Sequence, residues 1–158
     1  MIRIGTGYDV HPFEEGKRMM LGGVYIEGGP GLAGHSDGDA LVHAVIDALL
    51  GAAALGDIGS HFPSDREDLK DADSLDLLKE VSKLLQAVGY SVVNVDSTIV
   101  AQRPRMAPYI LEMRRKIAGA LSIDSGRVSV KATTTDGLGA MGRSEGIAAQ
   151  AVALIETA

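Results

Sequence analysis

HSDGDALVHAVIDALLGAAAL, residues 35–55, combines a strongly apolar helical pattern with a line of polar side chains. From position 39 on, apolar residues recur at helical spacing and form one broad stripe, at Leu41, Val42, Val45, Ile46, Leu49 and Leu50. The pattern predicts a core helix. We expect Ser36 or Asp37 to be its N-cap, with Gly38 allowing a tight turn into it.

Asp39, His43 and Asp47 lie four residues apart and therefore form a second stripe beside the apolar one, at the rim of the core. At such a position a lone histidine is most simply a half-buried, hydrogen-bonded side chain. His43 becomes a candidate ligand only if other donor groups meet it.

Residues 2–13 alternate as a β-strand whose apolar face carries Ile2, Ile4, Thr6, Tyr8 and Val10. Asp9 and His11 project from the other face, about 7 Å apart at the backbone, close enough for both to reach one ion. Gly5 and Gly7 share that face. We therefore expect a bulky group there, either a ligand or a partner strand.

Asp9, His11 and His43 supply one carboxylate and two imidazoles from two rigid elements. Three protein ligands leave one coordination position open, as in catalytic zinc sites. The same donors also suit a two-histidine, one-carboxylate iron(II) site, so ligand type leaves both metals open. The chain has no cysteine, which excludes thiolate ligands and disulfides.

The composition predicts a single domain covering residues 1–158, because 158 residues with 46% hydrophobic content can build one substantial core. A net charge of -6 argues against a nucleic-acid or anionic-membrane partner. No apolar run reaches the roughly 18 residues of a membrane span, and no signal segment is recognisable, so we expect a cytoplasmic protein.

The remaining patterns predict helices at 74–88 and 106–121, strands at 90–100 and 128–133, and short extended pieces at 18–21 and 24–26. Residues 147–155 suit a strand, although their alanines also allow a helix. The charged residues 65–73 suggest an exposed loop that covers a site, or a plain linker. This order predicts an α+β two-layer domain with helices packed on one face of a mixed β-sheet.

KATTTD at 131–136 ends a strand in three hydroxyls and a carboxylate, followed by glycines. These groups suit a phosphate with magnesium. Threonine also favours strands in general, so the run alone does not define a site.

Four motifs together resemble the 2-C-methyl-D-erythritol 2,4-cyclodiphosphate synthase family: GYDVHPF (7–13), GHSDGDALVHAVIDALLGAAALGDIGSHFP (34–63), AQRPRM (101–106) and KATTTDGLGAMGRSEGIAAQAV (131–152). The resemblance implies a metal-dependent phosphorus-oxygen lyase of non-mevalonate isoprenoid synthesis. Its substrate would be 4-diphosphocytidyl-2-C-methyl-D-erythritol 2-phosphate, and its products the cyclic diphosphate and CMP. It also implies a homotrimer with active sites between subunits.

By motif position, the resemblance assigns zinc to Asp9, His11 and His43, and a second cation, Mg²⁺ or Mn²⁺, to Asp136. His35 and Thr134 match the family's transition-state stabilisers. Residues 57–59 resemble a ribose-binding turn and 101–107 a cytosine-reading loop. The implied substrate contacts are Asp9, Val10, His11, His35, Ser36, Asp57, Ile58, Gly59, Phe62, Asp65, Ala101, Arg105, Met106, Ala107, Thr133, Thr134, Thr135, Asp136 and Arg143.

The chain departs from the family pattern at three positions. Asp136 stands where the family commonly has Glu, which gives the second cation a shorter ligand arm. Ser64 in HFPS replaces the usual Asp, and Ala140 replaces a larger residue near Arg143 and Glu145.

The implied chemistry needs alignment and charge neutralisation rather than a general base, because the attacking 2-phosphate is already anionic. Two other functions use the same residues. A metal-dependent nucleotide hydrolase would activate a zinc-bound water and release a linear product, and a non-catalytic diphosphate-binding trimer would leave the substrate unchanged.

Overall fold

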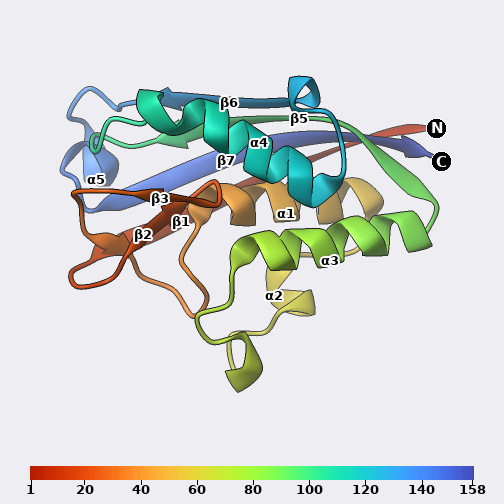
Figure 1. The fold of residues 1–158 in the computed structure, drawn as a ribbon, viewed down its shortest axis with the longest axis horizontal. Helices are drawn as coiled ribbons and strands as arrows, with labels where there is room; N and C mark the ends of the chain where they lie inside the picture. Colours follow the sequence, from red (N-terminus) through yellow and green to blue (C-terminus); the bar gives the residue numbers. More distant parts are fainter.

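The computed structural model describes residues 1–158 as a five-stranded mixed sheet covered on one face by helices (Figure 1). The strand order is β4-β1-β7-β5-β6. The β1–β7 and β5–β7 pairs are antiparallel and β5–β6 is parallel. The strands are β1 (Ile2–Glu14), β4 (Gly31–Leu32), β5 (Tyr90–Val100), β6 (Val128–Thr133) and β7 (Gly146–Thr157). The expected α+β class is therefore correct.

Three long helices form the covering layer: α1 (Ala40–Ala53), α3 (Ser74–Ala87) and α4 (Ile110–Leu121). α1 lies against β1 and β7, α4 lies over β6, and α3 packs between α1 and α4 (Figure 1). The small hairpin of β2 (Met19–Leu21) and β3 (Val24–Ile26) completes the core. None of these helices has the length and apolar content needed to cross a lipid bilayer.

The close contact between β1 and α1 explains the glycines of the first strand. A Cβ atom on Gly7 would lie 1.9 Å from the Ala44 carbonyl oxygen, and one on Gly5 would lie 2.1 Å from that of Ala48. Only glycine leaves room for the helix at this distance. The bulky group is thus helix α1, and the expected ligand or partner strand is wrong.

The apolar face of β1 points away from the helices and is open. Ile2, Ile4 and Tyr8 are 64%, 67% and 64% exposed. The alternation predicted from the sequence is present, but the face that packs inside the chain is the one with the glycines.

The N-cap of α1 is Asp39, which corrects the expectation of Ser36 or Asp37. Its carboxylate accepts hydrogen bonds from the backbone N–H of Val42, Gly22 and Gly23, at 3.0, 2.9 and 2.7 Å. Asp39 is fully buried and does not lie on a polar rim with His43. It joins the start of α1 to the β2–β3 turn instead.

Two further segments differ in detail from the sequence-based expectation. The helix expected from residue 106 begins as a 3-10 turn at Ala107–Tyr109 and becomes α-helical at Ile110. The segment before α3 contains the short helix α2 (Ile58–His61) and a 3-10 turn at Glu67–Leu69. Another one-turn helix, α5 (Gly139–Gly142), precedes β7, and a 3-10 turn at Ser125–Arg127 precedes β6.

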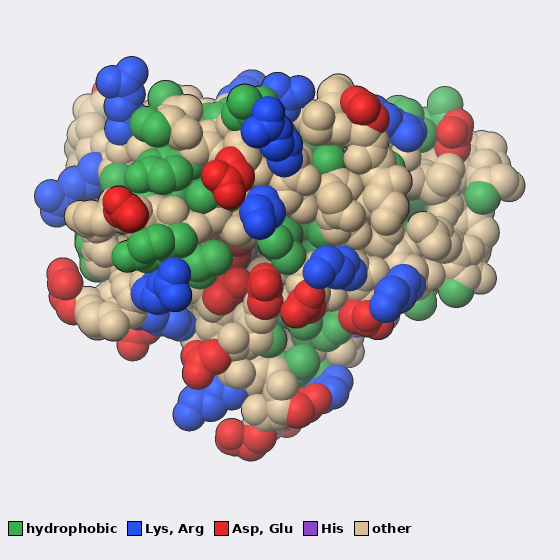
Figure 2. All heavy atoms as spheres, in the orientation of Figure 1, with side chains coloured by type: hydrophobic (Ala, Val, Ile, Leu, Met, Phe, Trp, Pro, Cys, Tyr) green, Lys and Arg blue, Asp and Glu red, His purple; other side chains and the backbone are tan.

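Residues 58–73 form a lobe that projects below the helical layer (Figures 1 and 2). Acidic and basic side chains are interspersed over the lobe and over the helical face (Figure 2). We refer to residues 65–73, the charged part of this lobe, as the lid segment.

Candidate metal centre and ligand cavity

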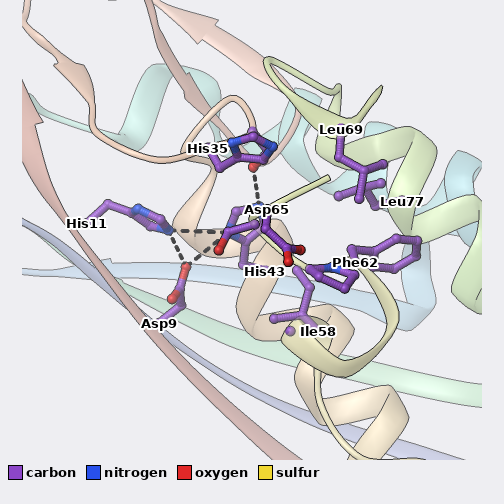
Figure 3. A pocket seen from close by; sticks show the side chains of 13 residues that line it. Asp9, His11, His35, His43, Ile58, Phe62, Asp65, Leu69 and Leu77 are labelled. Atoms are coloured by element: carbon purple, nitrogen blue, oxygen red, sulfur yellow. Dashed lines mark hydrogen bonds and ion pairs between the residues drawn. The ribbon is translucent and has the colours of Figure 1, made fainter. Parts of the chain in front are cut away.

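The structure brings three donor side chains together where β1 meets α1 (Figure 3). Asp9 Oδ2 lies 2.7 Å from His11 Nε2 and 3.2 Å from His43 Nδ1, and the two ring nitrogens are 3.2 Å apart. The β-alternation places Asp9 and His11 on the glycine face, and the close approach of α1 delivers His43 to them. These three ligand atoms can surround a single ion.

The outer nitrogens of both histidines have partners that favour metal binding by the inner ones. His11 Nδ1 lies 2.5 Å from the Ala33 carbonyl oxygen, which only accepts, so this nitrogen carries the proton and Nε2 is left with a lone pair. His43 Nε2 lies 2.8 Å from Ser74 Oγ and 3.1 Å from Ser36 Oγ. Such outer partners are characteristic of metal-binding histidines, and the donor set therefore fits a cation.

The electrostatics of the cluster favour positive charge. Burial acts to raise the pKa of Asp9, but the hydrogen bonds with His11 and His43 outweigh burial and lower it. Burial is the largest single influence on His11 and acts to lower its pKa, but the hydrogen bond with Asp9, the negative charge of Asp9 and the hydrogen bond with the Ala33 carbonyl together raise it. Asp9 is thus held as a carboxylate that attracts a proton or a cation. A divalent cation would displace that proton on binding.

A cavity of about 580 Å³ opens directly above this cluster. Asp9 and His11 lie on one side, and an apolar wall faces them, formed by Ile58, Phe62, Leu69 and Leu77 (Figure 3). His35, Ser36, Gly59 and Asp65 also line it. A mostly apolar cavity with a few convergent polar groups is typical of small-molecule sites.

The turn at the start of α2 is held by Asp47, the third residue of the predicted polar stripe. Asp47 Oδ1 accepts a hydrogen bond from the Ile58 N–H at 2.7 Å, while Asp57 Oδ1 caps the turn through Ser60 N at 2.9 Å. Burial raises the pKa of Asp47, and the hydrogen bonds from Ser60 lower the pKa of Asp57. Asp47 thus positions residues 57–59 at the edge of the cavity.

His35 connects the cavity to the lid segment. Its Nε2 lies 2.8 Å from the Arg66 carbonyl oxygen, and its own carbonyl accepts from the Asp71 N–H at 2.8 Å. The loop that carries His35 is in turn held by Lys17, whose Nζ donates to the carbonyls of Gly34 and Ser36 at 3.0 and 3.2 Å.

A second group of predicted residues lies at the ends of β5 and β6 and does not line this cavity. The segment after β5 contacts the end of β6 and the turn that follows it through two hydrogen bonds. The Ala101 N–H donates to the Thr133 carbonyl oxygen at 3.0 Å, and the Gly137 N–H donates to Gln102 Oε1 at 3.1 Å. We call residues 101–107 and 133–136 the strand-end cluster; it contains Ala101, Arg105, Met106, Ala107, Thr133, Thr134, Thr135 and Asp136.

Individual predicted contacts have distinct surroundings. Met106 and Ala101 are buried, so their side chains are not exposed to a ligand in a single chain. Arg143 pairs with Glu145 at 2.8 Å, and Val10 is on the open face of β1. One chain therefore brings together only part of the predicted site.

The sequence patterns did not indicate three neighbours of the site. Leu77 belongs to the apolar stripe of α3 and reads as an ordinary core residue. Asp37 reads as a helix cap and Ser74 as the first residue of the helix predicted at 74–88, and no spacing relates either to His43. Their role in the site depends on where α3 lies against α1.

Fold and site together define an α+β protein with a candidate metal centre that opens into a small-molecule cavity. A family model described as the YgbB family matches residues 2–156, and the chain belongs to that family. The 2-C-methyl-D-erythritol 2,4-cyclodiphosphate synthase of Syntrophomonas wolfei is 61% identical over 157 residues, covering 99% of this chain and 100% of that protein. The synthase of Chlorobium luteolum is 58% identical over 156 residues, covering 99% of each.

Solved structures agree with this assignment. The bifunctional IspDF of Campylobacter jejuni matches with a TM-score of 0.96 and 40% identity, covering 100% of this chain and 43% of that one. The IspF–CDP complex of Plasmodium falciparum matches with a TM-score of 0.86 and 34% identity, covering 99% and 96%. A CDP-bound cyclodiphosphate synthase matches with a TM-score of 0.89 and 32% identity, covering 98% and 100%.

Proposed function

We propose that residues 1–158 form one catalytic domain that converts 4-diphosphocytidyl-2-C-methyl-D-erythritol 2-phosphate into 2-C-methyl-D-erythritol 2,4-cyclodiphosphate and CMP. This reaction supplies isoprenoid precursors by the non-mevalonate route. The main observation in support of this proposal is that Asp9, His11 and His43 meet at a ligand cavity. They do so in a chain that is 61% identical, over 99% of its length, to a 2-C-methyl-D-erythritol 2,4-cyclodiphosphate synthase. The proposal places the enzyme in the cytoplasm with no membrane or nucleic-acid partner, and the net charge of -6 is in keeping with this.

In this proposal Asp9, His11 and His43 hold zinc, with iron(II) as the alternative left by the donor types. Asp136 serves Mg²⁺ or Mn²⁺ beside the substrate diphosphate, and its short side chain suits a water-bridged contact. When bound, the two metals supply Lewis-acid neutralisation of the phosphate charges.

The chain's own residues then bind and align the substrate. His35 and Ser36, which border the cavity, contact phosphate oxygens, and Thr134 with Thr133 and Thr135 donates from the strand-end cluster. The 2-phosphate is already a nucleophile, so no side chain has to remove a proton. Asp57, with its lowered pKa, stays ionised and accepts the ribose hydroxyls, while the backbone of Ile58 and Gly59 shapes the turn.

The separation of the cavity from the strand-end cluster supports a homotrimer with shared active sites. A neighbouring copy would bring its residues 101–107 to the cytosine and its residues 133–136 to the diphosphate. The open apolar face of β1 offers a surface for such copies. Phe62 and Asp65 would close over the nucleotide from the cavity side, and Val10 and Arg143 would contribute from the contact between copies.

Phosphorus NMR of the purified protein with this substrate and added Zn²⁺ and Mg²⁺ tests the function. We expect signals of the cyclic diphosphate and CMP. A linear product would indicate the hydrolase, and unchanged substrate the non-catalytic binding protein. The Asp9→Asn variant is the matched control, because it keeps the side-chain size but loses the ligand charge.

A further inference from the structure

Ser74 is a fully buried residue at the start of α3, directly behind the metal ligand His43. Its Oγ lies 2.8 Å from His43 Nε2. The same hydroxyl bonds Asp37 Oδ1, and the Ser74 N–H donates to Asp37 Oδ2 at 2.9 Å. The first residue of α3 therefore joins the candidate ligand His43 to a carboxylate.

Asp37, at one end of this series of hydrogen bonds, determines which group donates in each of them. The Asp37 carboxylate accepts, so the Ser74 hydroxyl donates its proton to Asp37. The Ser74 oxygen then accepts from His43 Nε2–H. With the proton on Nε2, the lone pair of the ring is on Nδ1, which is the atom that faces Asp9 and His11.

We propose that Ser74 is a positioning residue of the metal centre: backed by Asp37, it fixes the Nε2–H tautomer of His43 and the orientation of its ring. Ser36 Oγ also approaches His43 Nε2, but at the longer distance of 3.1 Å, and Ser36 lines the cavity where a substrate would compete for it. Ser74 is buried and has no such competitor. This inference rests on the proposed metal site and adds a residue to it.

Zinc affinity of the full-length protein, measured by competition with a chromophoric chelator, tests the inference. We expect Ser74→Ala to bind zinc about 10- to 100-fold more weakly than the unmodified protein, the usual effect of losing an outer partner of a ligand. The control is Ser82→Ala, on the same helix and also buried, with its hydroxyl near the Leu121 carbonyl at 3.5 Å. Ser82→Ala should keep full affinity.

Proton–nitrogen NMR of the zinc-loaded, unmodified protein gives a readout that needs no variant to fold. We expect His43 to show a proton on Nε2 that exchanges slowly with solvent. A His43 ring with its proton on Nδ1 overturns the inference. So does a folded Ser74→Ala that binds zinc as tightly as the unmodified protein, or an equal loss in Ser82→Ala. No zinc binding by the unmodified protein would overturn the proposed metal site itself.

Discussion

Lys17 is placed to control the position of His35 without touching substrate or metal ligands. Its ammonium donates to the carbonyls on both sides of His35. Charge-assisted bonds of this kind contribute about 1.5–3 kcal/mol. We expect Lys17→Met to lower kcat/KM about tenfold, because His35 loses its fixed orientation, while zinc affinity stays unchanged.

Steady-state kinetics with parallel zinc titration checks this prediction. Lys17→Arg, which keeps the charge and the donors, should retain most of the activity. Kinetics of Lys17→Met indistinguishable from those of the unmodified protein would show that the loop holds its position by other contacts.

Asp39 should make the folded protein less stable as the pH rises, which is the opposite of the usual effect of a carboxylate. Burial, followed by the nearby Asp37, raises its pKa to about 6, against the lowering effect of the N–H groups of Val42, Gly23 and Gly22. The folded state thus holds this proton more tightly than the unfolded chain, whose aspartates titrate near 4. The contribution of Asp39 to stability is therefore fully present below about pH 4 and is lost as pH rises to about 6 and beyond.

Urea unfolding of the metal-free protein at pH 5 and pH 7 measures this effect against Asp39→Asn, which cannot titrate. The stability advantage of the unmodified protein over the variant should shrink by about 1 kcal/mol between the two pH values. Asp9 and His11 titrate in both proteins, but Asp39 also helps to raise the pKa of His11, so the difference between the proteins includes this coupling. A constant or growing advantage would contradict the raised pKa.

The contact of α1 with β1 makes the strand glycines the most sensitive positions of the fold. We expect Gly7→Ala to cost roughly 3 kcal/mol or more, because its Cβ meets a helix carbonyl at 1.9 Å and the backbone has to move. Gly119→Ala is the control, and we expect it to change stability in the opposite direction. It lies within α4 with nothing within 4 Å of the added Cβ, and should stabilise by about 0.5–1 kcal/mol. Thermal unfolding of both variants checks the pair; equal effects would refute the close packing.

The lid segment should respond to nucleotide and to His35. Its contacts with the body include His35 Nε2 to Arg66 O and Asp37 N to Ala72 O, and most of its side chains are exposed. We expect fast hydrogen exchange at residues 65–73 without ligand, slower exchange with CMP, and the fastest exchange in His35→Ala. The same exchange with and without CMP would identify the segment as a plain linker.

The sequence predicts α1, β1 and their donor residues well because the helical and strand periodicities are both strong. Strand alternation places Asp9 and His11 on the same face of β1, and helical spacing places His43 on the polar stripe of α1. It does not predict which face of β1 is inside, since that depends on α1 packing onto Gly5 and Gly7 rather than on the strand's apolar side chains. The sequence does not single out Asp39 as the N-cap, because Ser36, Asp37 and Asp39 are all residue types that cap helices. Asp39 is the cap because its carboxylate also accepts hydrogen bonds from the N–H groups of Gly22 and Gly23, which are distant in sequence.

The strand expected at residues 147–155 is present as β7, although the local sequence supports it only weakly. Its alanines favour helix locally, yet it pairs with β1 on one side and β5 on the other, and the small side chains let α1 lie close to the sheet. Tertiary packing overrides the local preference. The strand-end cluster is recognisable as a motif, but its distance from the cavity within one chain cannot be deduced from the residues.

The proposed homotrimer would account for both the open sheet face and the divided site, and it yields a prediction for the complete enzyme. If sites are shared between copies, two inactive variants should restore each other when combined. His43→Ala disables the cavity of its own chain, and Thr134→Ala disables the strand-end cluster of its own. In a mixed trimer, an intact cavity of the second variant meets an intact cluster of the first, and forms a working site.

We expect each variant alone to be nearly inactive and the co-expressed, differently tagged pair to regain a measurable fraction of the activity. Ile4→Asp, on the open face of β1, is the control for assembly. It should sediment as a smaller species, lose activity and still bind zinc, because the three ligands belong to one chain. Mixed trimers that form but stay inactive would show that cavity and cluster do not act across the contact between copies, and the shared site would have to be abandoned.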